Sequence, residues 1–131
     1  RNKGLETSYN VRMGATDLRA SLTLQNPLNE TTGQQLVRRA KTLASTSLSH
    51  NIGLLTLGAS VRYMGSRPDI ESNPRLPSAV LLDLTARYAV ARQWTLYGRL
   101  ENATNSHYQT AYGYNQLPRS LFVGLSWRAQ P

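Results

Sequence analysis

Apolar and polar residues alternate along most of this chain with a period of two. The clearest segments are residues 18–24, 55–63, 80–90, 94–100 and 121–127, with a weaker one at 5–11. Successive side chains of a β-strand point to opposite faces, so each segment predicts a strand with one apolar and one polar face. A further segment, 36–49, has unclear parity and brings the count to seven strands. No segment of comparable length shows a helical period, and we expect an all-β fold.

The predicted connections alternate in length. Three are short, at residues 12–17, 49–53 and 89–93. Three are long and rich in Asn, Pro, Ser, Thr and Gly, at residues 26–35, 66–78 and 102–118. Tight turns at one end and long loops at the other are typical of antiparallel up-and-down transmembrane β-barrels. A soluble barrel or sandwich is the alternative, and its apolar faces would form a packed core.

Charged and aromatic positions favour the membrane barrel. The strand arginines lie on the polar parity, at Arg19, Arg62, Arg87 and Arg99. An Arg facing lipid near the bilayer midplane would cost about 2–4 kcal/mol, so this placement suits a wet lumen. Aromatic residues fall at or near the ends of the apolar stripes, at Tyr63, Tyr88, Trp94 and Trp127. Interfacial girdles place aromatic residues there, whereas a sandwich core has no such need.

Seven strands are too few for a complete barrel of this kind. Bacterial single-chain barrels have an even number of strands, from eight upward. We therefore expect residues 1–131 to be part of a larger barrel, whose earlier strands are absent from this sequence. The chain also starts at Arg1 without a Met or a signal-type apolar segment. Open strand edges would let the isolated fragment oligomerise.

Composition narrows the possible partners. Fifteen Lys plus Arg against seven Asp plus Glu give a formal charge of +8, which suggests an anionic partner such as nucleic acid, a membrane surface or an acidic ligand. Single-strand nucleic-acid binders combine a basic groove with exposed aromatic residues. Here the strand aromatics share the apolar face and the arginines lie opposite, which argues against nucleic acid. The chain has no cysteine, so disulfides and thiolate metal sites are excluded.

The C-terminal part contains Asn102, Tyr108, Gly113, Tyr114 and Arg119 at a characteristic spacing. With these residues it resembles the terminal hairpin of TonB-dependent outer-membrane receptors. Residues 103–106 depart from the usual Leu-Phe-Asp-Lys of that pattern, and Pro118 stands where Gly is common. The segments "QQLVRRAK" and "YMGSRPD" are similar to segments of the cobalamin (vitamin B12) receptor subgroup, although siderophore receptors share much of the pattern.

This resemblance implies a function for the whole protein. It implies a bacterial outer-membrane barrel of about 22 strands, of which residues 1–131 are the C-terminal part, with a plug domain and coupling to TonB. Such a receptor takes up a scarce nutrient, cobalamin or otherwise an iron–siderophore, without chemistry on its cargo. We expect no enzyme activity and no cofactor, and we expect membrane lipid and lipopolysaccharide as partners. The sequence does not fix the substrate.

The resemblance also suggests two sites. Arg38 would contact cobalamin near the outer mouth. The alternative for the cluster of Arg38, Arg39 and Lys41 is a solvated basic rim or a contact with lipopolysaccharide phosphates. The family's second ligand contact, a Tyr in the loop after "Y-x-G-x-R", has no counterpart in residues 66–75. The last strand would be the membrane-insertion signal, through Leu121, Val123, Leu125 and Trp127. Residues Arg128–Pro131 follow the aromatic residue, as a native extension or a cloning remnant.

Other polar residues have simpler interpretations. Asp69 and Glu71 are too few for a calcium site and predict solvated loop charges. Three acidic residues on the polar parity, Glu6, Asp83 and Glu101, should pair with lumen arginines such as Arg87 and Arg99, or face the plug. His50 and His107 are isolated, in a short turn and a long loop. The loop tyrosines, Tyr108, Tyr112 and Tyr114, should pack the loop rather than meet a ligand.

Overall fold

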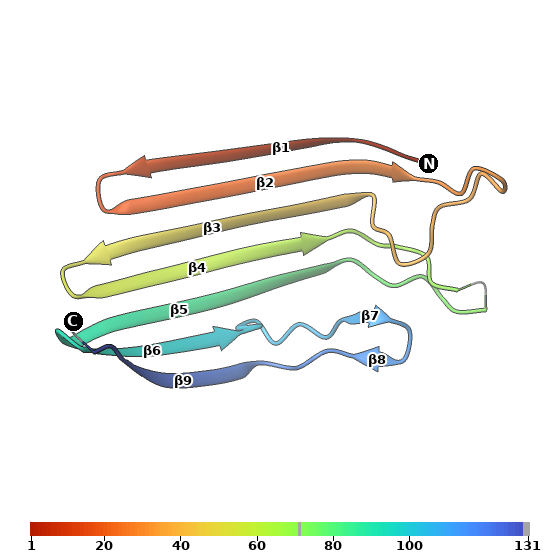
Figure 1. The fold of residues 1–131 in the computed structure, drawn as a ribbon. Helices are drawn as coiled ribbons and strands as arrows, with labels where there is room; N and C mark the ends of the chain where they lie inside the picture. The colour runs from red at the N-terminus through yellow and green to blue at the C-terminus, as the bar shows by residue number, and fades with distance from the viewer. Residues whose placement is uncertain (71, 130–131) are drawn as a thin grey trace.

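The protein is an all-β sheet. A computed structural model describes residues 1–70 and 72–129, and Figure 1 shows the strands lying side by side. The strands are β1 (Asn2–Met13), β2 (Thr16–Pro27), β3 (Thr42–Ile52), β4 (Leu55–Met64), β5 (Ala79–Ala91), β6 (Trp94–Glu101), β7 (Gln109–Ala111), β8 (Tyr114–Asn115) and β9 (Ser120–Trp127). In this part of the chain there is no helix long and apolar enough to cross a membrane.

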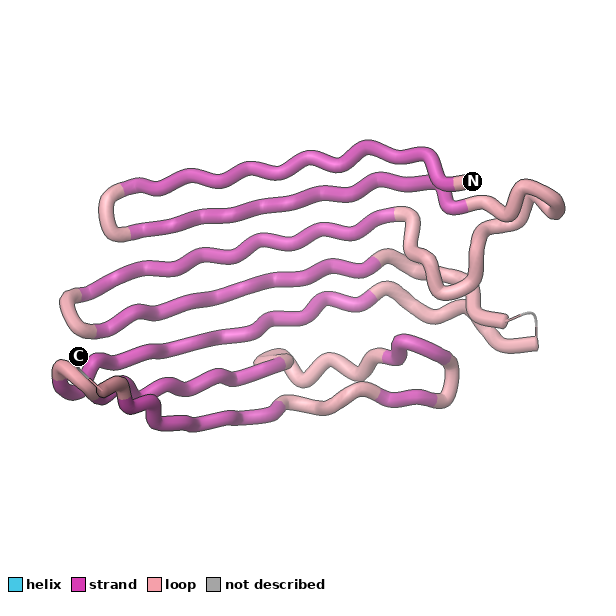
Figure 2. The backbone as a smooth tube through the Cα atoms, in the orientation of Figure 1, coloured by secondary structure: helices cyan, strands magenta, loops and turns pink. Residues whose placement is uncertain are grey.

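Seven of these strands form one antiparallel sheet in the order β1-β2-β3-β4-β5-β6-β9. The short strands β7 and β8 form a separate hairpin within the long connection between β6 and β9. Figure 2 shows the short turns gathered at one end of the sheet and the long loops at the other. The predicted all-β, antiparallel up-and-down arrangement is confirmed, with the predicted alternation of turns and loops.

Two of the tight turns depend on glycine. The β1–β2 turn contains Gly14 with φ 58°, and the β3–β4 turn contains Gly53 with φ 57°. Two-residue hairpin turns need positive φ because this backbone twist matches that of the flanking strands, and glycine adopts it without a Cβ clash. The third turn, between β5 and β6, follows a register irregularity between Ala89 and Ala91.

The register keeps apolar residues on one face across all seven strands. One row of neighbouring residues runs from β2 to β9 through Leu18, Leu48, Ala59, Leu84, Leu100 and Leu121. These side chains are not covered: Leu48 is 44% exposed, Leu84 39% and Leu121 69%. In the described part of the chain, strands contact only their neighbours in the sheet. The apolar face is therefore not the packed core of a sandwich.

Buried residues gather at the loop end of the sheet instead. They include Arg67 and Leu76, which form a β-bridge between the two halves of the β4–β5 loop, and Ala79 and Leu81 at the start of β5. Asp69 and Asn102 are buried in the same region. The long loops thus pack on one another.

Three local predictions were wrong. Residues 36–41 lie in the β2–β3 loop rather than in a strand, because Arg38 has φ 58° and its N–H donates to Pro68 O at 2.7 Å. His50 lies within β3 rather than in a turn, and its Nδ1 is 2.7 Å from Thr16 Oγ1. The loop after Asn102 also contains the β7–β8 hairpin, which was not predicted.

Candidate functional site

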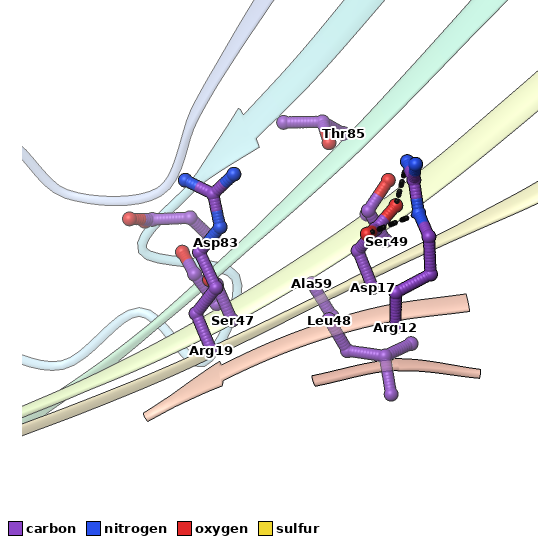
Figure 3. Close-up of a pocket in the computed structure, with 11 residues that line it drawn as sticks. Arg12, Asp17, Arg19, Ser47, Leu48, Ser49, Ala59, Asp83 and Thr85 are labelled. Carbon is purple, nitrogen blue, oxygen red and sulfur yellow. Dashed lines mark hydrogen bonds and ion pairs between the residues drawn. The ribbon is translucent and has the colours of Figure 1, made fainter. Parts of the chain in front are cut away.

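The polar face carries a hollow over strands β1 to β5. Figure 3 shows the residues that line it, including Arg12, Asp17, Arg19 and Asp83. Arg12 and Asp17 face each other across the β1–β2 pair, and Arg12 donates to both carboxylate oxygens, at 2.8 and 3.0 Å. This face is the one predicted to line an aqueous lumen, and its charged side chains agree with that prediction.

Further ion pairs on this face join acidic residues to lumen arginines, as predicted. Glu101 pairs with Arg99 at 3.1 Å, as expected, and Arg99 also lies over the Phe122 ring, 5.0 Å from its centroid. Asp83 pairs at 2.8 Å with Arg62, another of the arginines on the polar parity. The other oxygen of Asp83 accepts the Asn102 N–H at 2.9 Å, so this carboxylate also fixes the start of the last long loop.

A tyrosine covers a glycine on the last strand pair. Tyr97 in β6 lies directly opposite Gly124 in β9. A Cβ built on Gly124 would overlap the Tyr97 ring, including its Cζ and hydroxyl oxygen. The ring therefore occupies the space of the missing side chain, and this contact explains why the polar face of the last strand has a glycine at this position.

Asn102 shapes the loop between β6 and β9. It is buried and has φ 49°, a left-handed conformation that Asn tolerates better than most residues. Its Nδ2 donates to Ser106 O at 2.9 Å, and its Oδ1 accepts the Ser106 N–H at 2.8 Å. This residue belongs to the pattern that carried the family resemblance, and its role in the structure is to turn the chain out of β6.

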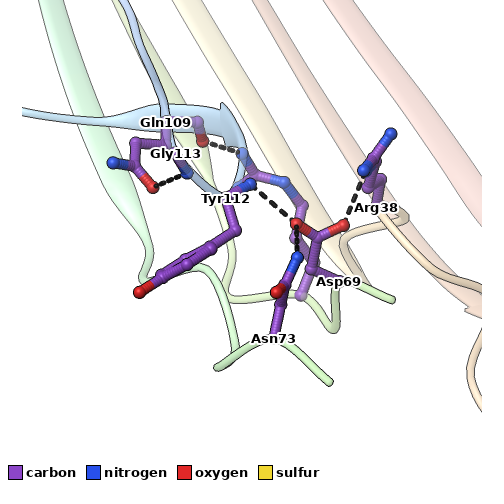
Figure 4. A network of polar contacts seen from close by, with 7 residues as sticks. Arg38, Asp69, Asn73, Gln109, Tyr112 and Gly113 are labelled. Carbon is purple, nitrogen blue, oxygen red and sulfur yellow. Dashed lines mark hydrogen bonds and ion pairs between the residues drawn. The ribbon is translucent and has the colours of Figure 1, made fainter. Parts of the chain in front are cut away.

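Asp69 joins the three long loops. Arg38 Nε donates to its Oδ1 at 2.6 Å, and the Tyr112 N–H donates to its Oδ2 at 2.6 Å. Asn73 Nδ2 lies 3.5 Å from Oδ2 (Figure 4). The three loops that meet here are those between β2 and β3, β4 and β5, and β6 and β9. We call Arg38, Asp69, Asn73 and Tyr112 the loop latch.

The loop latch sets the charge state of its carboxylate. The pKa of Asp69 is lowered to about 2, first by the hydrogen bond from the Tyr112 N–H and then by the Arg38 guanidinium. Desolvation of the buried carboxylate opposes this effect. The side chain of Asp69 is fully covered. The predicted solvated loop charge is therefore wrong for Asp69, because its oxygens are used by neighbouring loops. Glu71, the other proposed loop charge, lies outside the described residues.

Arg67 lies beside the loop latch and is 2% exposed. Its Nη2 donates to Gln109 O at 2.6 Å, which attaches β7 to the β4–β5 loop. Among the described residues its Nη1 has no hydrogen-bond acceptor. Desolvation lowers the pKa of Arg67, and the nearby charge of Asp69 partly opposes this effect.

The outer surface of the loops combines cations with exposed aromatic and aliphatic side chains. Arg38 keeps 48% of its side chain exposed although it binds Asp69. Tyr112 is 49% exposed and Tyr114 71%, which contradicts the prediction that these tyrosines pack the loop. In Figure 4 the Tyr112 ring points away from the loop latch. Other exposed apolar residues of the loops are Val37, Ile70 and Leu117.

The final strand has the predicted alternation. Leu121, Val123, Leu125 and Trp127 lie on the apolar face and are 57–69% exposed. The Trp127 ring lies 6.4 Å from that of Trp94 at the short-turn end. The strand pairing extends one residue further, since the Arg128 N–H donates to Gln93 O at 2.9 Å. A role in membrane insertion stays a prediction, and Gln130 and Pro131 lie outside the described residues.

The loop latch could not have been found from sequence spacing. Asp69 and Tyr112 are 43 residues apart, and the contact uses a backbone N–H, which carries no sequence signal. Only the family resemblance, which gives Arg38 as a ligand contact, pointed to this region. No group of three or more His, Cys, Asp or Glu side chains that could hold a metal ion occurs among the residues described.

We predict that Asp69→Asn loosens the loops without unfolding the sheet. Loss of the charge removes the ion pair with Arg38, so we expect hydrogen exchange in residues 109–115 to rise about tenfold. Glu30→Gln, which removes an exposed carboxylate of the β2–β3 loop, should leave this exchange unchanged. Unchanged exchange in Asp69→Asn would contradict the role of the latch.

The same network predicts a pH dependence. Because the folded pKa of Asp69 is about 2, below its ordinary value of 3.8, its stabilising contribution is complete above pH about 4. It is lost as pH falls from about 4 through 2. Exchange of the loops, corrected for the intrinsic pH effect, should therefore be constant from pH 7 to 5. A transition near pH 6 would contradict this assignment.

Comparison with known proteins identifies the fold. Residues 1–103 match the family model described as TonB dependent receptor-like, beta-barrel. The pyoverdine outer membrane receptor FpvA from Pseudomonas aeruginosa PAO1 is 19% identical with a TM-score of 0.81, over 98% of this chain and 21% of that chain. The siderophore receptor PiuA from Acinetobacter baumannii is 21% identical with a TM-score of 0.81, over 96% and 21%.

A third solved structure agrees. The ferric-catecholate import receptor Fiu from E. coli K12 is 16% identical with a TM-score of 0.79, over 96% of this chain and 20% of that chain. This chain thus spans about a fifth of the length of these receptors. The predicted outer-membrane location and the expectation of a protein that is not an enzyme both agree with the family match. The chain belongs to the TonB-dependent receptor β-barrel family.

Proposed function

We propose that this chain is the C-terminal part of the barrel of an outer-membrane receptor that takes up a metal chelate of the siderophore class. The observation that carries the substrate class is the surface around the loop latch. There the partly exposed Arg38 and the exposed Tyr112 lie on two sides of one buried carboxylate. Cationic and aromatic side chains together suit an anionic ligand with flat, aromatic groups.

The similar solved receptors support this choice. Two of the three are named for siderophores or pyoverdine, and the third for ferric catecholates. Cobalamin, favoured by the sequence resemblance at "QQLVRRAK", stays a second candidate. In this proposal the rest of the longer protein supplies the plug domain and the contact with TonB, and transport needs those parts.

In this proposal Arg38 has two tasks. Its Nε holds Asp69, while the exposed part of the guanidinium is available to an anionic ligand. A ligand contact and a structural role can be separated, because Asp69→Asn breaks the ion pair but keeps the guanidinium on the chain, whereas Arg38→Gln removes both.

We predict that Arg38→Gln weakens binding of a ferric catecholate siderophore to the full-length receptor about tenfold, the effect of one lost charge-assisted hydrogen bond. Titration calorimetry with ferric enterobactin, a ferric hydroxamate and cyanocobalamin would rank the ligand classes. Asp69→Asn should weaken binding less than Arg38→Gln. Equal losses in the two variants would assign the effect to loop order, and tightest binding of cyanocobalamin would overturn the siderophore proposal.

A further inference from the structure

Arg19 is a cation without a counter-charge in the hollow of the polar face. The hollow has a volume of about 370 Å³, and its charged lining residues are Arg12, Asp17, Arg19 and Asp83. Both oxygens of Asp17 accept hydrogen bonds from Arg12, and Asp83 is bound by Arg62. In the part of the chain that the structure describes, Arg19 is in no ion pair, and no contact reaches it in Figure 3. The carboxylates of the hollow are therefore in use, and Arg19 gives it one positive charge in excess.

The hollow is also rich in hydroxyl groups. Its lining residues with a side-chain hydroxyl are Ser47, Ser49, Ser60 and Thr85. Ser47 in β3 pairs with Arg19 on one side and with Ser60 on the other. Thr85 lies over Gly58, where its Oγ1 occupies the space of the missing side chain. A guanidinium beside several hydroxyl donors can bind the oxygen atoms of an anion.

A second hollow lies between this one and the long loops. It has a volume of about 340 Å³, and its polar lining residues include Arg62, Ser21 and Ser45. Ser45 is two residues nearer than Ser47 to the long-loop end of β3 and has the same parity, so the two hollows follow each other along this strand. Arg62 pairs with Ser45 and keeps 58% of its side chain exposed. An anion that moves from the loop latch along this wall therefore meets Arg62 first and Arg19 next.

We propose that the first hollow is a binding station for the anionic cargo inside the barrel, between the loops and the periplasmic end. We call Arg19, Ser47, Ser49, Ser60 and Thr85 the lumen station. Arg19 pairs with a catecholate or carboxylate group of the cargo, and the hydroxyls donate to its other oxygens. This inference rests on the proposed uptake of a siderophore. It goes beyond that proposal because it assigns a site below the loops and the part of the barrel wall along which the cargo passes.

The test compares binding and uptake of ferric enterobactin, labelled with radioactive iron, by cells that carry the full-length receptor and TonB. We expect Arg19→Gln to lower the uptake rate about tenfold, the effect of one lost charge-assisted hydrogen bond. Equilibrium binding should stay unchanged, because the cargo first binds at the loops. Arg87→Gln is the matched control, since Arg87 is an exposed arginine of the same face outside the hollow. Equal losses in the two variants would indicate general attraction to positive charge and would overturn the lumen station.

A second pair of variants tests the space in the hollow. Ser47→Phe fills it and should remove most of the uptake while binding persists. Ser120→Phe makes the same change on the polar face of β9, opposite Glu101 and outside the hollow, and should leave uptake unchanged. The heat-modifiable band shows whether both variants are folded. Uptake at the unsubstituted rate in folded Ser47→Phe would overturn the proposed site.

The remaining outcomes separate this inference from the proposed function. Uptake of cyanocobalamin but of no ferric siderophore would overturn the siderophore proposal and the lumen station with it. Uptake of ferric enterobactin at an unchanged rate in Arg19→Gln would overturn the lumen station alone. If that variant also had a lower melting temperature, the partner of Arg19 would be an acidic residue of the plug domain instead of the cargo.

Discussion

Leu48→Arg should prevent stable insertion of the barrel, because the substitution places a charge on the lipid face near the middle of β3. Leu48 is 44% exposed and lies in the apolar row that crosses the sheet from β2 to β9. An Arg on the lipid face near the bilayer midplane costs about 2–4 kcal/mol. That penalty corresponds to at least about a thirtyfold loss in the ratio of inserted to unfolded protein. The heat-modifiable band of the full-length receptor, folded into vesicles, measures this ratio.

Ser60→Arg provides the control for this prediction. Ser60 in β4 pairs with Ser47, the residue before Leu48, so both substitutions lie at nearly the same depth. Ser60 has the parity of the polar face and lies directly opposite Asp83. A new Arg there meets the aqueous lumen and a carboxylate, and we expect insertion close to that of the unsubstituted receptor. Equal losses in the two variants would contradict the assignment of the two faces.

The strands and their faces were predictable because the signal is local. Each strand alternates within its own sequence, and Gly14 and Gly53 mark two of the tight turns. Residues 36–41 misled the prediction because a positive φ at Arg38 and a hydrogen bond to Pro68 depend on another loop. Local sequence patterns do not report such distant partners.

The sequence predicted a lumen arginine as the partner of Asp83, but it could not say which one, for a related reason. Asp83 and Arg87 lie four residues apart on one strand, which separates them by about 13 Å. The register instead places Arg62 opposite Leu81, one diagonal step from Asp83. Strand register is a property of the assembled sheet, so the parity of Asp83 was predictable from the sequence and its partner was not. The same holds for the loop latch, whose members come from three separate loops.

Gly124→Val should destabilise the last hairpin, because the new side chain needs the space that the Tyr97 ring occupies. The two residues are direct partners across β6 and β9, and even a Cβ at Gly124 overlaps the ring. Forcing an extra side chain into occupied space typically costs about 1–3 kcal/mol. We expect a lower melting temperature of the full-length barrel and slower folding into vesicles, since β9 carries the proposed insertion signal.

The effect should change sign when the ring is removed. Valine has a higher strand propensity than glycine, by up to about 1 kcal/mol, so Gly124→Val in a Tyr97→Ala background should be neutral or stabilising. In the double-mutant cycle, the two substitutions together should then destabilise the barrel less than the sum of their separate effects, which is a favourable coupling. Purely additive effects would mean that Tyr97 does not lie on Gly124. In that case the glycine would have to be explained by a partner on the lumen side, supplied by the rest of the longer chain.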